Sequence, residues 1–291
     1  MSEDIKNAVS AQLGEKYGMY VGASVFTAND KGGVGKTTCK LIRTNVLVNL
    51  NVHFRLIDVD SRRNLTAYIE NSQQLSGIEI MGLNGFTTQK DVKKVGDAAR
   101  ELESHYDAAS EWWLSGTTET DVGAGRPDGL LQYERNSELP ELYKDAGIRP
   151  FRETVASADQ GSLESAYKLT TEWIRLYGTD ADHIMTLNDR TGRGFEWFEN
   201  GEAYPRLRKL EQDGVLEIIR IPFCDSLLVG ENIAMSPFEA LDRADEINEE
   251  LKLGAAQFGR EKRKLTKFLA EATEAFEPMC QRVAACSNGG A

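Results

Sequence analysis

The chain has 291 residues, of which 27% are charged and 41% hydrophobic, and its formal net charge at pH 7 is −12. These proportions are typical of a globular protein with one or two domains, and they argue against a disordered or fibrous chain. The acidic balance argues against a protein that coats nucleic acid with its whole surface, because phosphate neutralisation supplies most non-specific affinity. The four cysteines show no C-x-x-C spacing, so neither a zinc site nor a disulfide framework is indicated.

No apolar run approaches the length of a membrane span, and residues 1–19, interpreted as an N-terminal extension, lack an apolar signal core. We therefore expect a cytoplasmic protein without integral membrane association.

A glycine-rich stretch near the N-terminus is the strongest functional pattern. Residues 30–38 read D-K-G-G-V-G-K-T-T and lie between an apolar, β-leaning run at 20–28 and a proline-free helical pattern at 38–50. Glycines at such a junction let backbone N–H groups surround a phosphate, a lysine neutralises its oxygens, and a threonine hydroxyl binds Mg²⁺. The stretch therefore predicts a phosphate-binding loop with Lys36 and Thr37 in those two roles.

Short strand-like runs alternate with helical stretches along most of the chain, which we interpret as one domain spanning 1–291. Further strands are expected at 52–58, 78–82, 183–188 and 216–222, and helices at 88–104, 128–146, 161–177, 203–213 and 237–252. This alternation predicts an α/β fold with a mostly parallel twisted sheet and helices on both faces. Ligands then bind at the carboxyl ends of the strands.

Two stretches fit this pattern poorly. A buried parallel strand is normally a near-continuous apolar run, but 108–127 and 147–156 contain unusually polar segments, W-W-L-S-G-T-T-E-T-D at 112–121 and R-P-F-R-E-T-V at 149–155. Either these strands lie near an edge of the sheet, or their boundaries differ from those expected.

A second lysine, Lys31, precedes Lys36 by five residues, and Asp30 stands where the general phosphate-loop pattern has glycine. The string K-G-G-x-G-K-T-T resembles the deviant phosphate loop of the ParA/MinD family of ATPases. The resemblance implies a P-loop NTPase domain that binds ATP or ADP with Mg²⁺ through the loop residues Lys31, Gly32, Gly33, Val34, Gly35, Lys36, Thr37 and Thr38. It also implies that Lys31 reaches the phosphates of a partner subunit, so that ATP holds a homodimer together and slow hydrolysis dissolves it.

The same resemblance assigns roles to two later segments. Asp58 and Asp60 end the second predicted strand, where Asp60 would position the attacking water and Asp58 would support the Mg²⁺ shell. With Lys31 and Lys36, Asp60 completes the expected catalytic set. In D-V-G-A-G at 121–125, Asp121 would hold a magnesium-bound water and Gly123 would offer its N–H to the γ-phosphate. The alternative for the first pair is a solvated strand-end turn.

Two residues further along resemble the family's adenine site. Asn188 follows a predicted strand and would hydrogen-bond the base through its amide, and Pro222 belongs to a loop that would pack against the base. An Asx turn that closes the strand is the alternative for Asn188.

The C-terminal region predicts an amphipathic helix over 255–277 and a disordered tail over 287–291. Four basic residues share one face of this helix: Arg260, Arg263, Lys264 and Lys267. Such a stripe could contact DNA phosphates, an acidic partner or an anionic membrane, or be a solvated face.

The function most consistent with these patterns is a Mg²⁺-dependent ATPase switch in plasmid or DNA partition, stabilisation or positioning, working with a protein activator or cargo adaptor. Two alternatives remain open: a metabolic P-loop enzyme of the same class, and a nucleotide-dependent interaction module that does not hydrolyse ATP.

Overall fold

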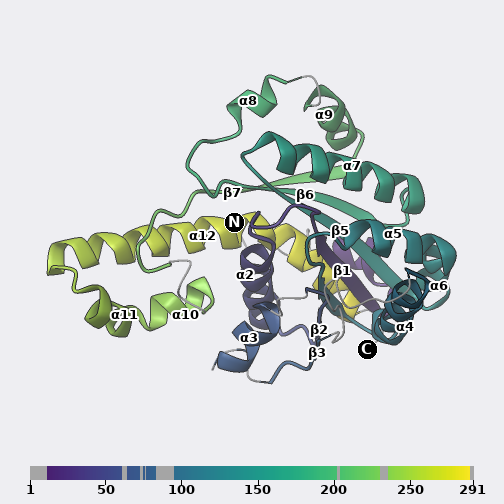
Figure 1. The fold of residues 1–291 in the computed structure, drawn as a ribbon, viewed down its shortest axis with the longest axis horizontal. Helices are drawn as coiled ribbons and strands as arrows, with labels where there is room; N and C mark the ends of the chain where they lie inside the picture. The colour runs from purple at the N-terminus through teal and green to yellow at the C-terminus, as the bar shows by residue number, and fades with distance from the viewer. Residues whose placement is uncertain are drawn as a thin grey trace.

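A computed structural model describes residues 12–60, 64–72, 75, 77–82, 95–201, 204–229 and 235–288. It confirms the predicted α/β fold, because these residues form one seven-stranded sheet in the order β3-β2-β4-β1-β5-β6-β7 with every neighbouring pair parallel (Figure 1). The strands are β1 (Gly22–Ala28), β2 (Arg55–Asp58), β3 (Ile80–Gly82), β4 (Thr118–Asp121), β5 (Ile148–Ser157), β6 (Asp182–Asn188) and β7 (Leu216–Ile221).

Helices cover both faces of this sheet. One face carries α2 (Lys36–Asn49), α3 (Asn64–Asn71), α10 (Pro237–Asp242), α11 (Ala244–Leu251) and α12 (Ala255–Asn288). The other carries α4 (Val95–Trp113), α5 (Pro127–Asn136), α6 (Leu139–Asp145), α7 (Gln160–Tyr177), α8 (Glu196–Glu199) and α9 (Tyr204–Gln212). None of these described helices is long and apolar enough to span a bilayer.

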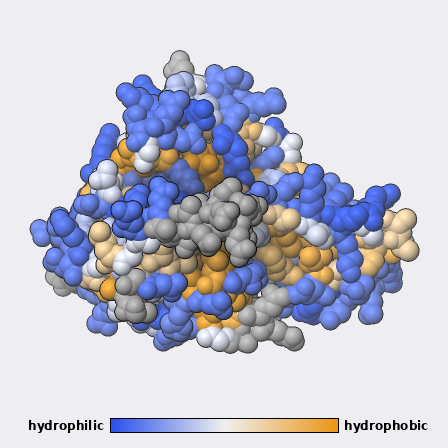
Figure 2. All heavy atoms as spheres, turned by 180° about the vertical axis from the view of Figure 1, so that it is seen from behind, coloured by the Kyte–Doolittle hydropathy of each residue, from blue (hydrophilic) through white to orange (hydrophobic). Residues whose placement is uncertain are grey.

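The central strand β1 shows why the sheet needs both layers. All of its residues are buried. Ala23 and Val25 pack into the core beneath α2 and α12, whereas Phe26 and Ala28 pack into the opposite core beneath α4 and α7. This alternation follows from the two-residue period of a strand. Viewed from behind, hydrophilic residues cover most of the surface, and hydrophobic ones show mainly in the recesses between elements (Figure 2).

The two polar stretches lie at the centre of the sheet. β4 and β5 flank β1 on its two sides, so the edge-strand interpretation is wrong. The expected boundary was also wrong at one place, because Trp112 and Trp113 end α4 and the strand begins only at Thr118.

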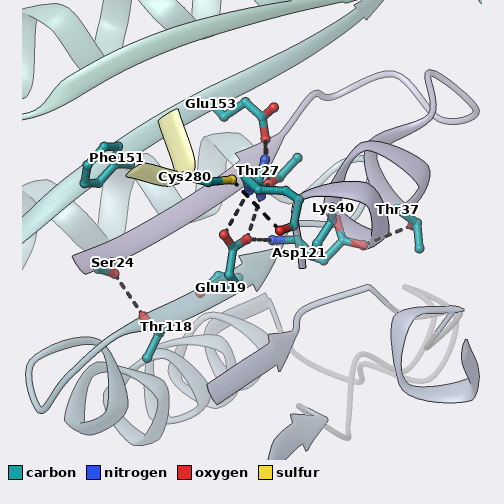
Figure 3. Close-up of polar contacts among 12 residues, drawn as sticks. Ser24, Thr27, Thr37, Lys40, Thr118, Glu119, Asp121, Phe151, Glu153 and Cys280 are labelled. Carbon is teal, nitrogen blue, oxygen red and sulfur yellow. Dashed lines mark hydrogen bonds and ion pairs between the residues drawn. The ribbon is translucent and has the colours of Figure 1, made fainter. Parts of the chain in front are cut away.

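Paired charges explain how such polar strands can be buried. The fully buried Lys40 and Arg43 of α2 project onto the sheet. Lys40 Nζ lies 2.9 Å from Glu119 (Figure 3), and Arg43 lies 2.6 Å from Glu119 and 2.5 Å from Glu153. The hydroxyls of Thr27 and Thr186 also donate to Glu153, at 2.8 and 2.7 Å. Buried charges are tolerated when they are paired and hydrogen-bonded.

Several helix boundaries also differ from those expected. The helix expected at 128–146 is interrupted between α5 and α6, where Glu138 adopts a φ of 51°. The one expected at 237–252 breaks at Arg243 between α10 and α11. Of the helix expected at 88–104, only the part from Val95 onward lies within the described residues.

The C-terminal helix is longer than predicted. α12 continues beyond 277 to Asn288, so Ser287 belongs to the helix rather than to a disordered tail, and its hydroxyl lies 2.6 Å from that of Thr117. Residues 1–11 of the expected N-terminal extension and 289–291 of the expected tail lie outside the described residues.

Candidate functional site

The glycine-rich loop leaves the carboxyl end of β1 and wraps around one ammonium group. Lys36 Nζ donates to the carbonyl oxygens of Asn29, at 3.1 Å, and Lys31, at 3.3 Å. Asn29 is itself buried, and its amide donates to the Val155 carbonyl at 2.7 Å, which anchors the start of the loop to β5. Burial lowers the pKa of Lys36, and the nearby Asp121, Asp60 and Asp30 oppose that shift. The loop therefore holds a cation that further negative charge would stabilise.

Gly35 can be only glycine in this geometry. Its φ is +92°, and a Cβ there would lie 2.1 Å from Nδ2 of Asn188. The same Asn188 amide donates to the Val34 carbonyl at 3.0 Å. The end of β6 thus packs directly on the loop, and the side-chain amide of the sequence-predicted Asn188 contacts the loop backbone.

Two adjoining cavities lie beside the loop. The first, here called the phosphate cavity, has a volume of about 330 Å³ and is lined by Gly32, Gly33, Val34, Gly35, Lys36, Thr37, Thr38, Asp60, Ala124 and Arg190. The second, the base cavity, has a volume of about 290 Å³ and is lined by Thr38, Leu41, Tyr68, Asn188, Asp189, Arg190, Pro222, Cys224, Val229, Met235, Pro237 and Phe268. Thr38 and Arg190 belong to both linings, so a single extended ligand could occupy the two cavities.

A carboxylate suited to a cation lies beside the phosphate cavity. Thr37 donates its hydroxyl proton to Asp121 Oδ2 at 3.0 Å (Figure 3), while Asp121 Oδ1 is buried and has no hydrogen-bond partner among the described residues. Burial, reinforced by Asp58, raises the pKa of Asp121 to about 6. Oxygen ligands of this kind suit Mg²⁺, which takes one or two from the protein and the rest from phosphate and water. Thr37 and Asp121 therefore fit a magnesium ion.

The two aspartates after β2 have different surroundings. Asp58 is fully buried, and its carboxylate accepts from the backbone N–H of Asp60 at 3.0 Å and from both the N–H and the hydroxyl of Thr66 at 2.9 Å. Asp58 thus joins Asp60 to Thr66 in the first turn of α3, and its magnesium role stays a prediction. Asp60 is half-buried and lines the phosphate cavity.

The segments after β2 and β4 touch each other. A Cβ on Gly123 would lie 2.9 Å from the Cα of Asp60, so the close approach requires glycine. Asp30 Oδ1 also accepts from the N–H of Gly125 at 3.1 Å. Three segments far apart in the sequence therefore meet around one edge of the phosphate cavity.

Lys31 points away from the phosphate cavity of its own chain. Its ammonium forms an ion pair with Asp159, and the two side chains are 47% and 40% exposed. Asp159 caps the N-terminus of α7 by accepting from the N–H of Ser162 at 3.0 Å. The sequence-predicted Lys31 is thus separate from the cluster that contains Lys36, Thr37 and Asp60.

Two contributions to the site were not predicted. Arg190 contacts the carbonyl of Gly33 and lines both cavities. Asp30, noted only as a departure from the general loop pattern, fastens the loop to the segment after β4. Arg190 directly follows Asn188 and Asp189 at the carboxyl end of a predicted strand. Ligands bind at this end of a parallel sheet, so this position is the sequence signal that could have identified Arg190.

The predicted basic residues of α12 are all exposed, but they are not equivalent. Lys264 lies 2.8 Å from Asp225 and 3.3 Å from Glu261, and Lys267 lies 3.6 Å from Glu271. Lys264 is therefore engaged by its own chain.

Comparison with known proteins finds no matching family model and no matching curated protein. Among solved structures, the chain is similar to the MinC:MinD cell division protein complex of Aquifex aeolicus, at 14% identity and a TM-score of 0.41, over 86% of this chain and 96% of that one. It is also similar to the MinD cell division protein of the same organism, at 15% identity and a TM-score of 0.40, over 86% and 98% of the two chains. Similarity at this level does not allow residue roles or an activity to be transferred to this chain. The fold is assigned from the observed strand order alone.

Proposed function

We propose that this chain is a Mg²⁺-dependent ATPase of the ParA/MinD type, which binds ATP across the phosphate and base cavities. The observation that carries the proposal is the phosphate cavity itself. Every loop residue from Gly32 to Thr38 lines it together with Asp60, and the Thr37–Asp121 pair lies at its side. A helix N-terminus with inward-facing N–H groups and a buried lysine is a ready anion site.

Each polar group has a task in this proposal. Lys36 neutralises charge on the phosphate oxygens, and Thr37 and Asp121 hold Mg²⁺, which supplies further neutralisation of the triphosphate when bound. Asp60 orients the attacking water from the cavity wall. Little covalent chemistry is needed, because phosphoryl transfer depends mainly on positioning and electrostatic stabilisation.

The base cavity offers a suitable place for the nucleoside. Pro222 lines it, and Asn188 lies at its junction with the loop. The amide oxygen of Asn188 and the remaining N–H of its amide group are the atoms that we assign to adenine, since one N–H already serves Val34.

ATP-dependent homodimerisation is the proposed mechanical output. Lys31 is exposed, and its ion pair with Asp159 is of the partly solvated kind that contributes little stability. The triphosphate of a facing subunit carries more negative charge than one carboxylate, so it can draw Lys31 across the interface. A cation supplied in trans then stabilises the transferring phosphoryl group, much as an arginine finger does.

Light scattering combined with phosphate-release assays tests this proposal. Wild-type protein should double in mass with ATP but not with ADP, and Asp60→Ala should remain dimeric in ATP because it cannot complete hydrolysis. Lys31→Ala should stay monomeric in both nucleotides. If Asp60→Ala behaves as the wild type and neither releases phosphate, the protein is a non-hydrolysing interaction module. If Lys31→Ala hydrolyses ATP at the wild-type rate as a monomer, a metabolic P-loop enzyme is the better description.

We further propose that the dimer positions DNA or a protein cargo, with a protein activator of hydrolysis. The exposed basic residues Arg260, Arg263 and Lys267 support a DNA contact, with Lys264 adding to it only if its ion pairs open. Reversing Arg260, Arg263, Lys264 and Lys267 to glutamate should abolish ATP-dependent retention on DNA. Unchanged retention would remove α12 from the proposed interface.

A further inference from the structure

The wall of the base cavity is formed partly by an irregular segment. Residues 222–229 follow β7 without forming a helix or strand, and Pro222, Cys224 and Val229 line the base cavity. α12 supplies another part of the wall through Phe268, which is buried. The C-terminal helix and the segment after β7 thus enclose the same ligand space.

An irregular segment needs partners for its backbone groups other than those of a sheet or helix. Here α12 provides one for the N–H of Leu227 and also holds two side chains of the segment. The N–H of Leu227 donates to the Glu261 carboxylate at 2.9 Å, and the hydroxyl of Ser226 donates to the Glu261 carbonyl at 3.0 Å. Lys264 adds an ion pair with Asp225 at 2.8 Å and lies 3.3 Å from Glu261. We call this set of contacts, made by Glu261 and Lys264 to residues 225–227, the α12 clamp.

Glu261 is the central member of the clamp. It is only 4% exposed although it is a carboxylate on a helix whose neighbouring residues are mostly solvated. Acidic residues are rarely buried unless they are paired or hydrogen-bonded, and a hydrogen bond from a backbone N–H to a carboxylate is stronger than one between neutral groups. The buried Glu261 carboxylate therefore fixes the segment that forms part of the wall of the base cavity, by accepting from the N–H of Leu227.

The clamp is separate from the phosphate cavity. The phosphate cavity is lined by residues 32–38, Asp60, Ala124 and Arg190, and neither α12 nor residues 222–229 contribute to it. Loss of the clamp should consequently act on the base end of a nucleotide and leave the triphosphate end unchanged.

We propose that Glu261, supported by Lys264, is a positioning residue for base recognition: it holds residues 225–227 so that the base cavity fits the nucleobase. This inference rests on the proposed nucleotide site and adds α12 to it as a determinant of affinity.

Calorimetric titration with Mg²⁺ and two probes, ATP and inorganic tripolyphosphate, separates the two ends of the site. Glu261→Ala removes the acceptor for Leu227 and should weaken ATP binding by roughly tenfold or more, the range expected for one hydrogen bond to a charged group. Tripolyphosphate affinity should stay within about twofold of the wild type, since residues 32–38 are unchanged. Glu261→Gln, which keeps an acceptor oxygen, should restore part of the ATP affinity.

Glu271→Gln is the matched control, because Glu271 lies on the exposed face of the same helix and pairs only weakly with Lys267 at 3.6 Å. Lys264→Ala tests the clamp from its solvated side and guards against poor folding of Glu261→Ala. Equal weakening of both probes, or ATP affinity unchanged in Glu261→Ala and Lys264→Ala, would overturn the inference. So would a wild type that binds tripolyphosphate as tightly as ATP. If the wild type binds neither probe, the proposed nucleotide site fails first, and the inference with it.

Discussion

Glu119→Gln removes one of the two carboxylates that balance the buried cations of α2. Glu119 accepts from Lys40 at 2.9 Å and from Arg43 at 2.9 and 2.6 Å, and no part of these side chains is exposed. With Glu153, the four charges sum to zero in the wild type. In the variant one positive charge remains without a counter-ion in the centre of the sheet.

The expected cost follows from that imbalance. Removing one partner of a buried ion pair typically destabilises a protein by about 3–5 kcal/mol, whereas whole domains are stable by only about 5–15 kcal/mol. Glutamine preserves the shape and can still accept from Lys40 or Arg43, so the loss comes mainly from the missing charge. A loss of this size is a large fraction of the stability of the whole protein.

Urea unfolding followed by circular dichroism measures the effect. At slopes of about 1–3 kcal/mol per molar urea, the midpoint should fall by about 1 M or more. Glu172→Gln is the matched control, since Glu172 pairs with Arg135 and Arg175 on the surface, and its midpoint should hardly move. A Glu119→Gln midpoint equal to that of the control would refute the view that paired charges allow β4 and β5 to be buried.

Three further predictions concern the site and its surroundings. Burial raises the pKa of Asp121 from 3.8 to about 6, so the stability that its protonation provides is lost as pH rises through 6. Without Mg²⁺, the Asp121→Asn variant should therefore have a higher melting temperature than the wild type at pH 7. The same variant should bind Mg²⁺·ATP poorly. Burial lowers the pKa of His183 from 6.5 to about 4, so the stability that its neutral imidazole provides is lost as pH falls. In urea titrations, the free energy of unfolding of the wild type relative to His183→Gln should drop by about 2 kcal/mol between pH 7 and pH 5. Gly35→Ala should abolish ATP binding in calorimetry, because Gly35 has a φ of +92° and its Cβ would lie 2.1 Å from Nδ2 of Asn188. Gly254→Ala, whose Cβ would meet no described atom within 4 Å and which lines neither cavity, should bind ATP normally.

The loop and its placement could be predicted because the relevant signals are local. A strand, a glycine-rich turn and a helix follow one another within residues 20–50, and parallel topology then places the ends of the later strands at the same edge. Asp60, Asp121, Asn188 and Pro222 are therefore predicted near the loop, where the structure also has them.

The buried charges could not be predicted in the same way. Lys40 and Glu119 are 79 residues apart, and each looks like a surface residue in its own segment. Polarity therefore indicates an edge strand or a misplaced boundary, whereas the charge pairing across the α2–sheet interface allows these strands to lie at the centre of the sheet. A helix with two cations on its buried side, followed by polar strands, is the pattern that would have revealed it.

The α12 clamp could not be predicted from the sequence either, for a related reason. Lys264 fits a basic stripe by its helical spacing, but its partner Asp225 lies in an irregular segment with no periodicity. Glu261 interrupts the stripe and looks like a surface charge until the packing of α12 on residues 225–227 is known. Periodicity identifies faces of a helix, and only the tertiary fold shows what each face contacts.

Calorimetric titration of ATP into the wild type and Lys36→Ala, with Mg²⁺ and again with a chelator, tests the nucleotide site most directly. We predict one ATP per chain, tighter binding with Mg²⁺, and loss of binding in Lys36→Ala. Equal affinity in the two proteins, or affinity indifferent to Mg²⁺, would contradict the assignment of residues 32–38 and Asp121 to a magnesium–nucleotide site.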